Sequence, residues 1–173
     1  MTNKEVVEDF FRGFDDLDAE RMISCLADDI VYNDPIYGIL NGEDVRSLWK
    51  MRCKDLSGLS LEIIEFKELD HEYATCKWRS SFFSKSAARQ VDMVVTSFMK
   101  LRNGKIAEHS DAYKLSDWLA KAYGVTGVFL GWTGWMKKRE QKKFHGLLEK
   151  FIENSRFFSG NQRREHDYDF SDR

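Results

Sequence analysis

The spacing of apolar residues along this chain changes near Leu59, from a helical period to the two-residue period of strands. Three segments before this point predict helices: residues 2–14, 19–26 and 42–53. A short strand is expected at residues 30–33, and four long strands follow at Leu59–Phe66, Tyr73–Phe83, Gln90–Leu101 and Ile106–Tyr113. Helices that precede a meandering antiparallel sheet indicate an α+β fold, in which the helices cover one face of the sheet.

Polar residues mark where each predicted helix begins. Thr2 and Glu5 have the spacing of a capping box, in which each side chain binds a backbone N–H of the first turn. Asp18 and Asn41 stand at the expected cap positions of the second and third helices. The boundaries of the three helices therefore agree with their apolar periods.

Asn103-Gly104, between two apolar runs, is the strongest turn signal in the chain, because both residues accept a positive φ. It predicts a hairpin of the last two strands. Side chains alternate between the faces of a strand, so His109 and Asp111 should point into the same space. They are either part of a polar site or a histidine paired with its carboxylate partner inside the core.

Asp34 precedes Pro35, the only proline of the chain, which forces the aspartate into an extended backbone conformation. One interpretation is a carboxylate that caps a turn. The other is a functional group that meets Asp111. Desolvation and like-charge repulsion would then raise at least one carboxyl pKa, leaving an acid and a base at neutral pH.

The C-terminal third of the chain is expected to contain two helices. Ser116 should cap a helix that runs from Trp118 to Tyr123, and a further helix is expected to begin near Met136. We divide the chain into a domain at 1–118, a helical extension at 119–155 and a flexible charged tail at 156–173. The apolar run at 125–135 and the basic residues up to 143 have two interpretations: packing on the domain or on a dimer mate, which we favour, and peripheral contact with a membrane.

Composition excludes several classes of protein. The chain has 173 residues, 42% hydrophobic, and a net charge of −2, which fits one folded domain without a field that attracts nucleic acid. Three cysteines lack metal-ligand spacing and an N-terminal apolar segment is missing, so we expect a cytoplasmic location. No metal or nucleotide motif is present, and no cofactor is expected.

The segments FFRGFDDLDAERMISCLADDIVYNDPIYG, GEDVRSLWKM and RNGKIAEHSDAYKLSDWL resemble the nuclear transport factor 2-like (NTF2-like) superfamily. The likeness is to its SnoaL-like branch, which includes ketosteroid isomerase, polyketide cyclases and limonene-epoxide hydrolase. It implies a cone, in which three N-terminal helices pack on a curved sheet and the open end is a ligand pocket. It also implies a homodimer formed through the outer face of the sheet.

The resemblance transfers unevenly to individual residues. Asp34 stands where ketosteroid isomerases carry their general base, and Asp111 resembles an acidic residue of cyclase- and epoxide-hydrolase-type relatives. The oxyanion-hole donors are absent, because this chain has Phe10 and Ser97 at their positions, so steroid isomerase activity is not expected. Six residues are candidates for the pocket wall, with plain core packing as the alternative: Tyr32, Trp49, Trp78, Ser97, Met99 and Tyr113.

The leading hypothesis is a SnoaL-like protein that binds a small apolar molecule in the cone. It would act as an acid–base isomerase, cyclase or hydrolase on a carbonyl, hydroxyl or epoxide compound. Asp34 would abstract a proton or position water, Asp111 would be its acid–base partner, and His109 would orient or donate. The alternatives are a non-catalytic ligand carrier that uses the same cavity and, less favoured, a protein-interaction adaptor.

Overall fold

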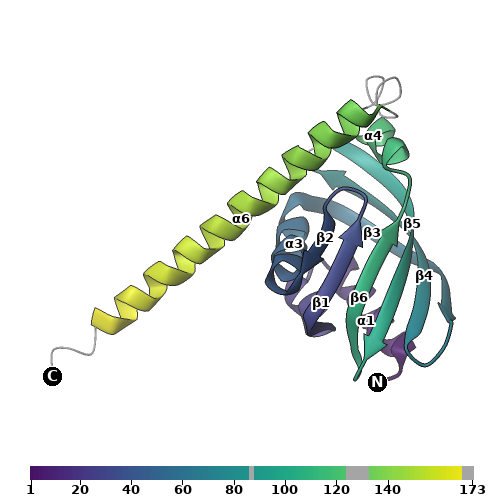
Figure 1. The fold of residues 1–173 in the computed structure, drawn as a ribbon, viewed down its shortest axis with the longest axis horizontal. Coiled ribbons are helices and arrows are strands. Elements are labelled where there is room, and N and C mark those ends of the chain that lie inside the picture. The colour runs from purple at the N-terminus through teal and green to yellow at the C-terminus, as the bar shows by residue number, and fades with distance from the viewer. Residues whose placement is uncertain (86–87, 124–132, 169–173) are drawn as a thin grey trace.

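The computed structural model describes residues 1–85, 88–123 and 133–168. Its helices are α1 (Asn3–Asp15), α2 (Ala19–Ser24), α3 (Gly42–Asp55), α4 (Leu115–Tyr123) and α6 (Gly134–Tyr168). Its strands are β1 (Leu26–Asp34), β2 (Gly38–Asn41), β3 (Leu56–Glu68), β4 (Tyr73–Ser84), β5 (Arg89–Arg102) and β6 (Lys105–Ala112). The expected α+β fold is confirmed, with three N-terminal helices and one curved sheet (Figure 1).

The six strands are ordered β2-β1-β6-β5-β4-β3. β3 to β6 form the predicted antiparallel meander. β1 is longer than expected and pairs with β6 in parallel, while β2, which the sequence pattern did not predict, pairs with β1. The parallel pair places Tyr32 beside His109 and thereby aligns the end of β1 with the end of β6.

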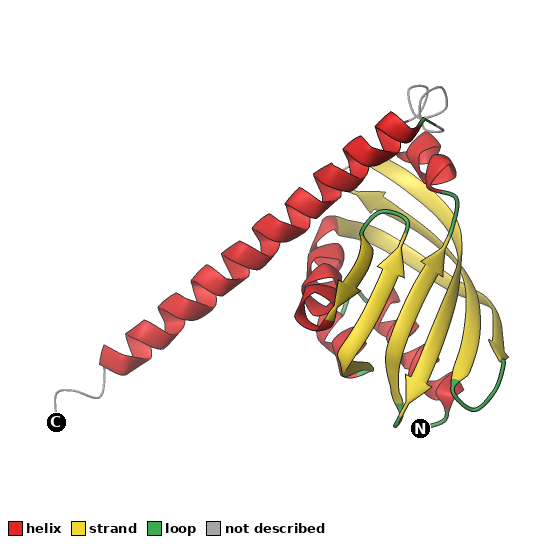
Figure 2. Cartoon of the chain, in the orientation of Figure 1, coloured by secondary structure: helices red, strands yellow, loops and turns green. Residues whose placement is uncertain are grey.

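The helices of the domain lie against one face of the sheet (Figure 2). α1 begins at the predicted capping box and buries an aromatic face that includes Phe10, Phe11 and Phe14. The Phe10 ring packs edge-on against Trp49 of α3, with 5.3 Å between the ring centroids. Aromatic side chains from the two helices therefore fill the closed part of the cone.

The predicted hairpin is confirmed. Asn103 and Gly104 have φ values of 53° and 70°, as a two-residue turn between β5 and β6 requires. Arg102 pairs with Lys105 across this turn. On β6, His109 and Asp111 are buried while Glu108 is exposed, so the expected alternation of faces holds.

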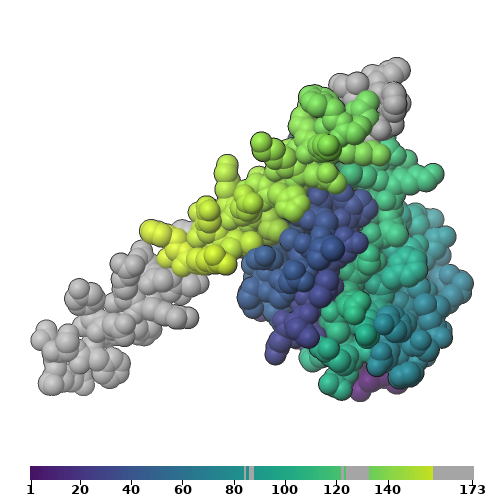
Figure 3. Space-filling view, in the orientation of Figure 1, coloured from purple at the N-terminus to yellow at the C-terminus, as the bar shows by residue number. Residues whose placement is uncertain are grey.

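α6 is the main difference from the sequence-based expectation. It begins at Gly134, and the backbone stays helical to Tyr168, so residues 156–168, expected to be an irregular tail, belong to this helix. The far part of α6 extends beyond the rest of the molecule (Figure 1), whereas its first part lies against the domain (Figure 3). Most of the apolar run at 125–135 lies outside the described residues, and Trp135, at its end, is exposed.

Among the described helices, none is both long and apolar enough to cross a membrane.

Candidate functional site

A cavity of about 340 Å³ lies between the inner face of the sheet and helices α3, α4 and α6. Its walls are mostly apolar, with Phe14, Trp78 and Val95 on the side of the domain. The polar groups that reach it are Tyr37, Arg52, Asp55, Ser80, Asp111, Tyr113, Lys150 and Asn154. An apolar cavity with a few polar groups is the usual form of a small-molecule site.

Asp111 is one of two carboxyl groups that line this cavity, the other being Asp55, and three donors hold Asp111. Oδ1 accepts from the Ser97 hydroxyl at 2.6 Å and lies 2.8 Å from Nε2 of His109. Oδ2 accepts from the Tyr32 hydroxyl at 2.8 Å. Ser97 in turn accepts from the indole N–H of Trp78 at 2.8 Å, so its hydroxyl is polarised toward Asp111.

These donors decide the charge of Asp111. Burial alone would raise the pKa of this carboxyl group, but His109 and the hydrogen bond from Ser97 outweigh it, and the net pKa is lowered. Asp111 is therefore a carboxylate at neutral pH, although only 5% of the residue is exposed.

Asp34 closes the turn that leads from β1 to β2. Its Oδ1 accepts the backbone N–H groups of Ile36 at 2.9 Å and Tyr37 at 2.5 Å, the pattern expected of a carboxylate that caps a turn. Its Oδ2 accepts from the Tyr113 hydroxyl at 3.2 Å. Asp34 is buried behind Tyr113 and is not itself part of the cavity wall.

The pKa of Asp34 shifts in the opposite direction to that of Asp111. Burial raises it, and the charge of Arg52 and the two backbone N–H groups only partly oppose this effect. Arg52 lies 3.5 Å from Oδ2 of Asp34. Two aspartates of the same site thus differ in their readiness to hold a proton.

The Tyr32 hydroxyl connects the two carboxyl groups. It lies 2.8 Å from Oδ2 of Asp111 and 3.4 Å from Oδ2 of Asp34, and Nη1 of Arg52 donates to it at 3.4 Å. Burial and the nearby carboxylates raise its pKa well above the ordinary value, so the hydroxyl keeps its proton. The expected meeting of Asp34 and Asp111 is therefore indirect and runs through a tyrosine.

His109 lies on the side of Asp111 that faces away from the cavity. Its ring packs among Phe10, Tyr32 and Trp49, and stacks on Trp49 with a 25° angle between the rings. Its Nδ1 has no hydrogen-bond partner within the described part of the chain. This position suits a residue that fixes Asp111 and does not touch a ligand.

The six pocket-wall candidates separate into two groups. Trp78 and Tyr113 line the cavity. Four do not line it: Tyr32, Trp49, Ser97 and Met99. Tyr32 and Ser97 reach the cavity only through Asp111, Trp49 packs in the aromatic core, and Met99 borders a different hollow that also includes Phe98.

Sequence reasoning missed Arg52, Ser80 and the wall formed by α6. Arg52 shares the apolar face of α3 with Trp49, and a charged residue on such a face was the signal that could have identified it. Ser80 lies on the inner face of β4, where its Oγ finds no partner among the described residues. Nothing in the local sequence distinguishes this serine from a surface residue.

Comparison with known proteins assigns the chain to a family. The model of the SnoaL-like domain matches residues 7–109, and no curated protein matches the chain. One similar structure is a protein of ketosteroid isomerase-like fold from Catenulispora acidiphila, solved in complex with trimethylamine. It is 20% identical, has a TM-score of 0.60, and aligns over 70% of this chain and 94% of its own.

Two further structures are similar over comparable lengths. An NTF2-like protein of unknown function from Burkholderia pseudomallei is 16% identical, with a TM-score of 0.60 over 70% of this chain and 98% of its own. An LEH-like epoxide hydrolase from M. tuberculosis is 16% identical, with a TM-score of 0.59 over 73% of this chain and 94% of its own. These likenesses show the shared fold, and the family match covers more than half of the sequence. Its fold is that of the NTF2-like protein, and the chain belongs to the SnoaL-like domain family.

Proposed function

We propose that this protein is an acid–base enzyme acting on a small, uncharged, largely apolar molecule with a carbonyl, hydroxyl or epoxide group. The observation that carries the proposal is the pair Asp34 and Asp111, whose pKa values shift in opposite directions beside one cavity. Paired carboxyl groups whose environments separate their pKa values serve as acid and base in enzymes.

The charges at the cavity favour a neutral ligand. Asp111 is negative, Arg52 is positive because the surrounding tyrosines and Asp34 raise its pKa against the effect of burial, and Asp34 tends to hold its proton. The carboxylate of Asp111 and the guanidinium of Arg52 balance, and so do Asp55 and Lys150, the other two charged side chains of the cavity wall. A charged ligand would be desolvated without a counter-charge, which is costly in an apolar site.

The chain of hydrogen bonds supplies a route for protons. Asp111 would take a proton from the substrate or from an attacking water. Tyr113, which lines the cavity and donates to Asp34, would pass its hydroxyl proton to a substrate oxygen and recover one from the carboxyl group of Asp34. Asp111 then holds the added proton, and Asp34 is ionised.

Tyr32 would restore the starting state. Its hydroxyl would give a proton to Asp34 while it accepts the proton held by Asp111, because it lies within reach of both carboxyl groups. No proton is gained or lost over the cycle, as an isomerisation, cyclisation or epoxide hydration requires. His109 and Ser97 would keep Asp111 oriented.

The direct test is Asp111→Asn. We would measure hydrogen–deuterium exchange next to the carbonyl of 2-tetralone by NMR, and hydrolysis of styrene oxide by chromatography. Loss of the base should lower whichever of the two rates the wild type shows by about 10²- to 10⁴-fold. Tyr32→Phe should slow multiple turnovers more than the first one, because only the return of the proton is lost.

Asp92→Asn, on the exposed face of β5, is the matched control and should keep the wild-type rate. An unchanged rate in a folded Asp111→Asn variant would contradict the proposed mechanism. Binding of either compound without any reaction, in both wild type and variant, would instead identify a non-catalytic carrier.

We also propose that the protein is a homodimer in the cytoplasm. The outer face of the sheet exposes large apolar side chains, including Val94 and Phe98 of β5, which is typical of an association surface. The three cysteines, all in the described part of the chain, are free thiols, which favours a reducing compartment. Contact of the basic part of α6 with a membrane remains the less favoured alternative.

A further inference from the structure

We propose that α6 forms a selectivity wall, which limits the ligand to a compact molecule of about one or two rings. The inference rests on the proposed function, because it takes the cavity beside Asp111 as the ligand site. The wall consists of Phe144, Leu147 and Phe151, which line the cavity from the side opposite the sheet.

These three residues form one face of the helix. They are three and four residues apart, so their side chains follow each other along the cavity. The Phe144 ring packs against Trp118 and Tyr37, with centroid distances of 5.3 and 6.0 Å. The apolar wall is thus continuous with α4 and with the turn that follows Asp34.

Polar contacts hold α6 in place. The side-chain amide of Gln141 donates to the backbone carbonyl of Pro35 at 2.9 Å, next to Asp34. Glu140 is buried and accepts from the guanidinium Nε of Arg139 at 3.0 Å and from the Tyr123 hydroxyl. The wall is therefore anchored both to the turn that carries the site and to α4.

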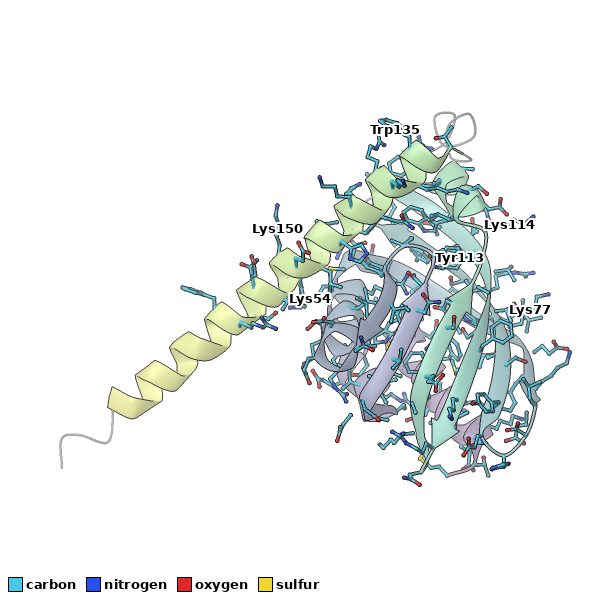
Figure 4. The ribbon with its side chains drawn as sticks, in the orientation of Figure 1. Lys54, Lys77, Tyr113, Lys114, Trp135 and Lys150 are labelled. Carbon is cyan, nitrogen blue, oxygen red and sulfur yellow. The ribbon has the colours of Figure 1, made fainter. Side chains whose placement is uncertain are left out.

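The other end of the wall is anchored to α3. The ammonium group of Lys54 lies over the Phe151 ring, 5.1 Å from its centroid. Figure 4 shows Lys54 on α3 and Lys150 on α6, where the two helices pack together. Leu147 and Phe151 are partly exposed, so the wall is one layer of side chains thick and can be altered without removing core.

The wall lies outside the part of the chain that matches the family model. The family model ends at residue 109, before α6 begins. Nearly the whole of the relative from Catenulispora acidiphila, 94%, aligns with only 70% of this chain. The cavity that α6 helps to enclose, about 340 Å³, falls at the small end of the range of about 300–1,000 Å³ for ligand sites.

The test is a ligand series of increasing size, bound to the full chain: cyclohexanone, 1-tetralone and anthrone, with one, two and three rings. Binding is measured by quenching of tryptophan fluorescence, since Trp78 and Trp118 line the cavity. Leu147→Ala and Phe151→Ala should each strengthen binding of anthrone relative to cyclohexanone by on the order of tenfold. Leu147→Trp should weaken binding of 1-tetralone by a similar factor and leave cyclohexanone within about twofold.

Glu149→Ala, on the exposed side of the same helix, is the matched control and should leave all three affinities unchanged. Equal binding ratios in wild type, Leu147→Ala and Leu147→Trp would overturn the selectivity wall and leave the proposed function standing. If none of the three ketones binds any form of the protein, the cavity is not a site for such ligands, and both proposals fall.

Discussion

Asp34 and Asp111 carry the same side chain, and their surroundings alone make them different. Asp111 receives donors from three side chains, whereas Asp34 binds backbone N–H groups on one oxygen, and in Asp34 the effect of burial outweighs the opposing effects on its pKa. Backbone N–H groups and Arg52 oppose the upward shift of the Asp34 pKa without reversing it. The distribution of donors therefore decides the direction in which the pKa of each carboxyl group shifts.

This difference predicts how stability depends on pH. Burial raises the pKa of Asp34 in the folded protein, so above the unfolded-state pKa of about 3.9 the unfolded chain loses a proton that the folded protein retains. The free energy of unfolding of the wild type should therefore fall, relative to Asp34→Asn, as the pH rises from about 4. Melting temperatures of both proteins, measured from pH 4 to pH 8, should show a difference that grows in favour of the variant. A constant difference would mean that Asp34 titrates normally.

For single residues, the sequence predicted the candidate site only in part. It predicted that Asp34, Asp111 and His109 lie close together, because a pre-proline aspartate and two-residue spacing on a strand can be recognised directly. It did not identify the connection through Tyr32. A hydroxyl that lies between residues 34 and 111 depends on the relative placement of β1 and β6, which no local pattern encodes.

Among the elements, the β5–β6 hairpin was the most predictable and α6 the least. The turn at Asn103-Gly104 is a local requirement for positive φ, whereas the parallel pairing of β1 with β6 depends on the whole sheet. The end of α6 was not predicted because dense charge was interpreted as a sign of a flexible tail, yet arginine, glutamate and glutamine are good helix formers. Much of α6 lies beyond the domain, where apolar periodicity is weak (Figure 1).

Two glycine substitutions test this account of the β5–β6 turn and of α6. Gly104→Ala should lower the free energy of unfolding by about 1 kcal/mol, because its φ of 70° strains a residue with a Cβ atom, and no neighbouring atom lies within 4 Å to add a clash. Gly146→Ala, inside α6 and equally free of close neighbours, should raise it by about 0.5–1 kcal/mol. Chemical denaturation of both variants measures the effect. Equal shifts of the same sign would contradict this account of the turn.

For the whole molecule, the cone and its family were correctly expected from three sequence segments, and the family match confirms them. We did not expect α6 to enclose the cavity. The wall depends on how residues 144–151 pack against the domain. The sequence predicted a helix that begins near Met136 but not the surface that this helix covers.

A substitution on the outer face of the sheet tests the oligomeric state of the whole molecule. Phe98→Lys, on the outer face of β5, should convert the proposed dimer to a monomer, because a buried unpaired charge is costly at an apolar interface. Light scattering coupled to size-exclusion chromatography measures the mass. Glu149→Lys, at an exposed position on α6, is the control and should remain dimeric. A wild-type mass of a single chain would contradict the dimer.

The parallel pairing of β1 with β6 also has a consequence for folding. β3 to β6 connect neighbours in the chain, so their hairpins can form early, whereas β1 must close a loop of roughly 75 residues before it meets β6. Asp34 lies on β1 and Asp111 lies on β6, so the two carboxyl groups come together only when β1 pairs with β6. The proposed catalytic pair is thus among the last contacts to assemble, and a chain arrested before this step would hold most of its sheet but not the arrangement of Asp34 and Asp111.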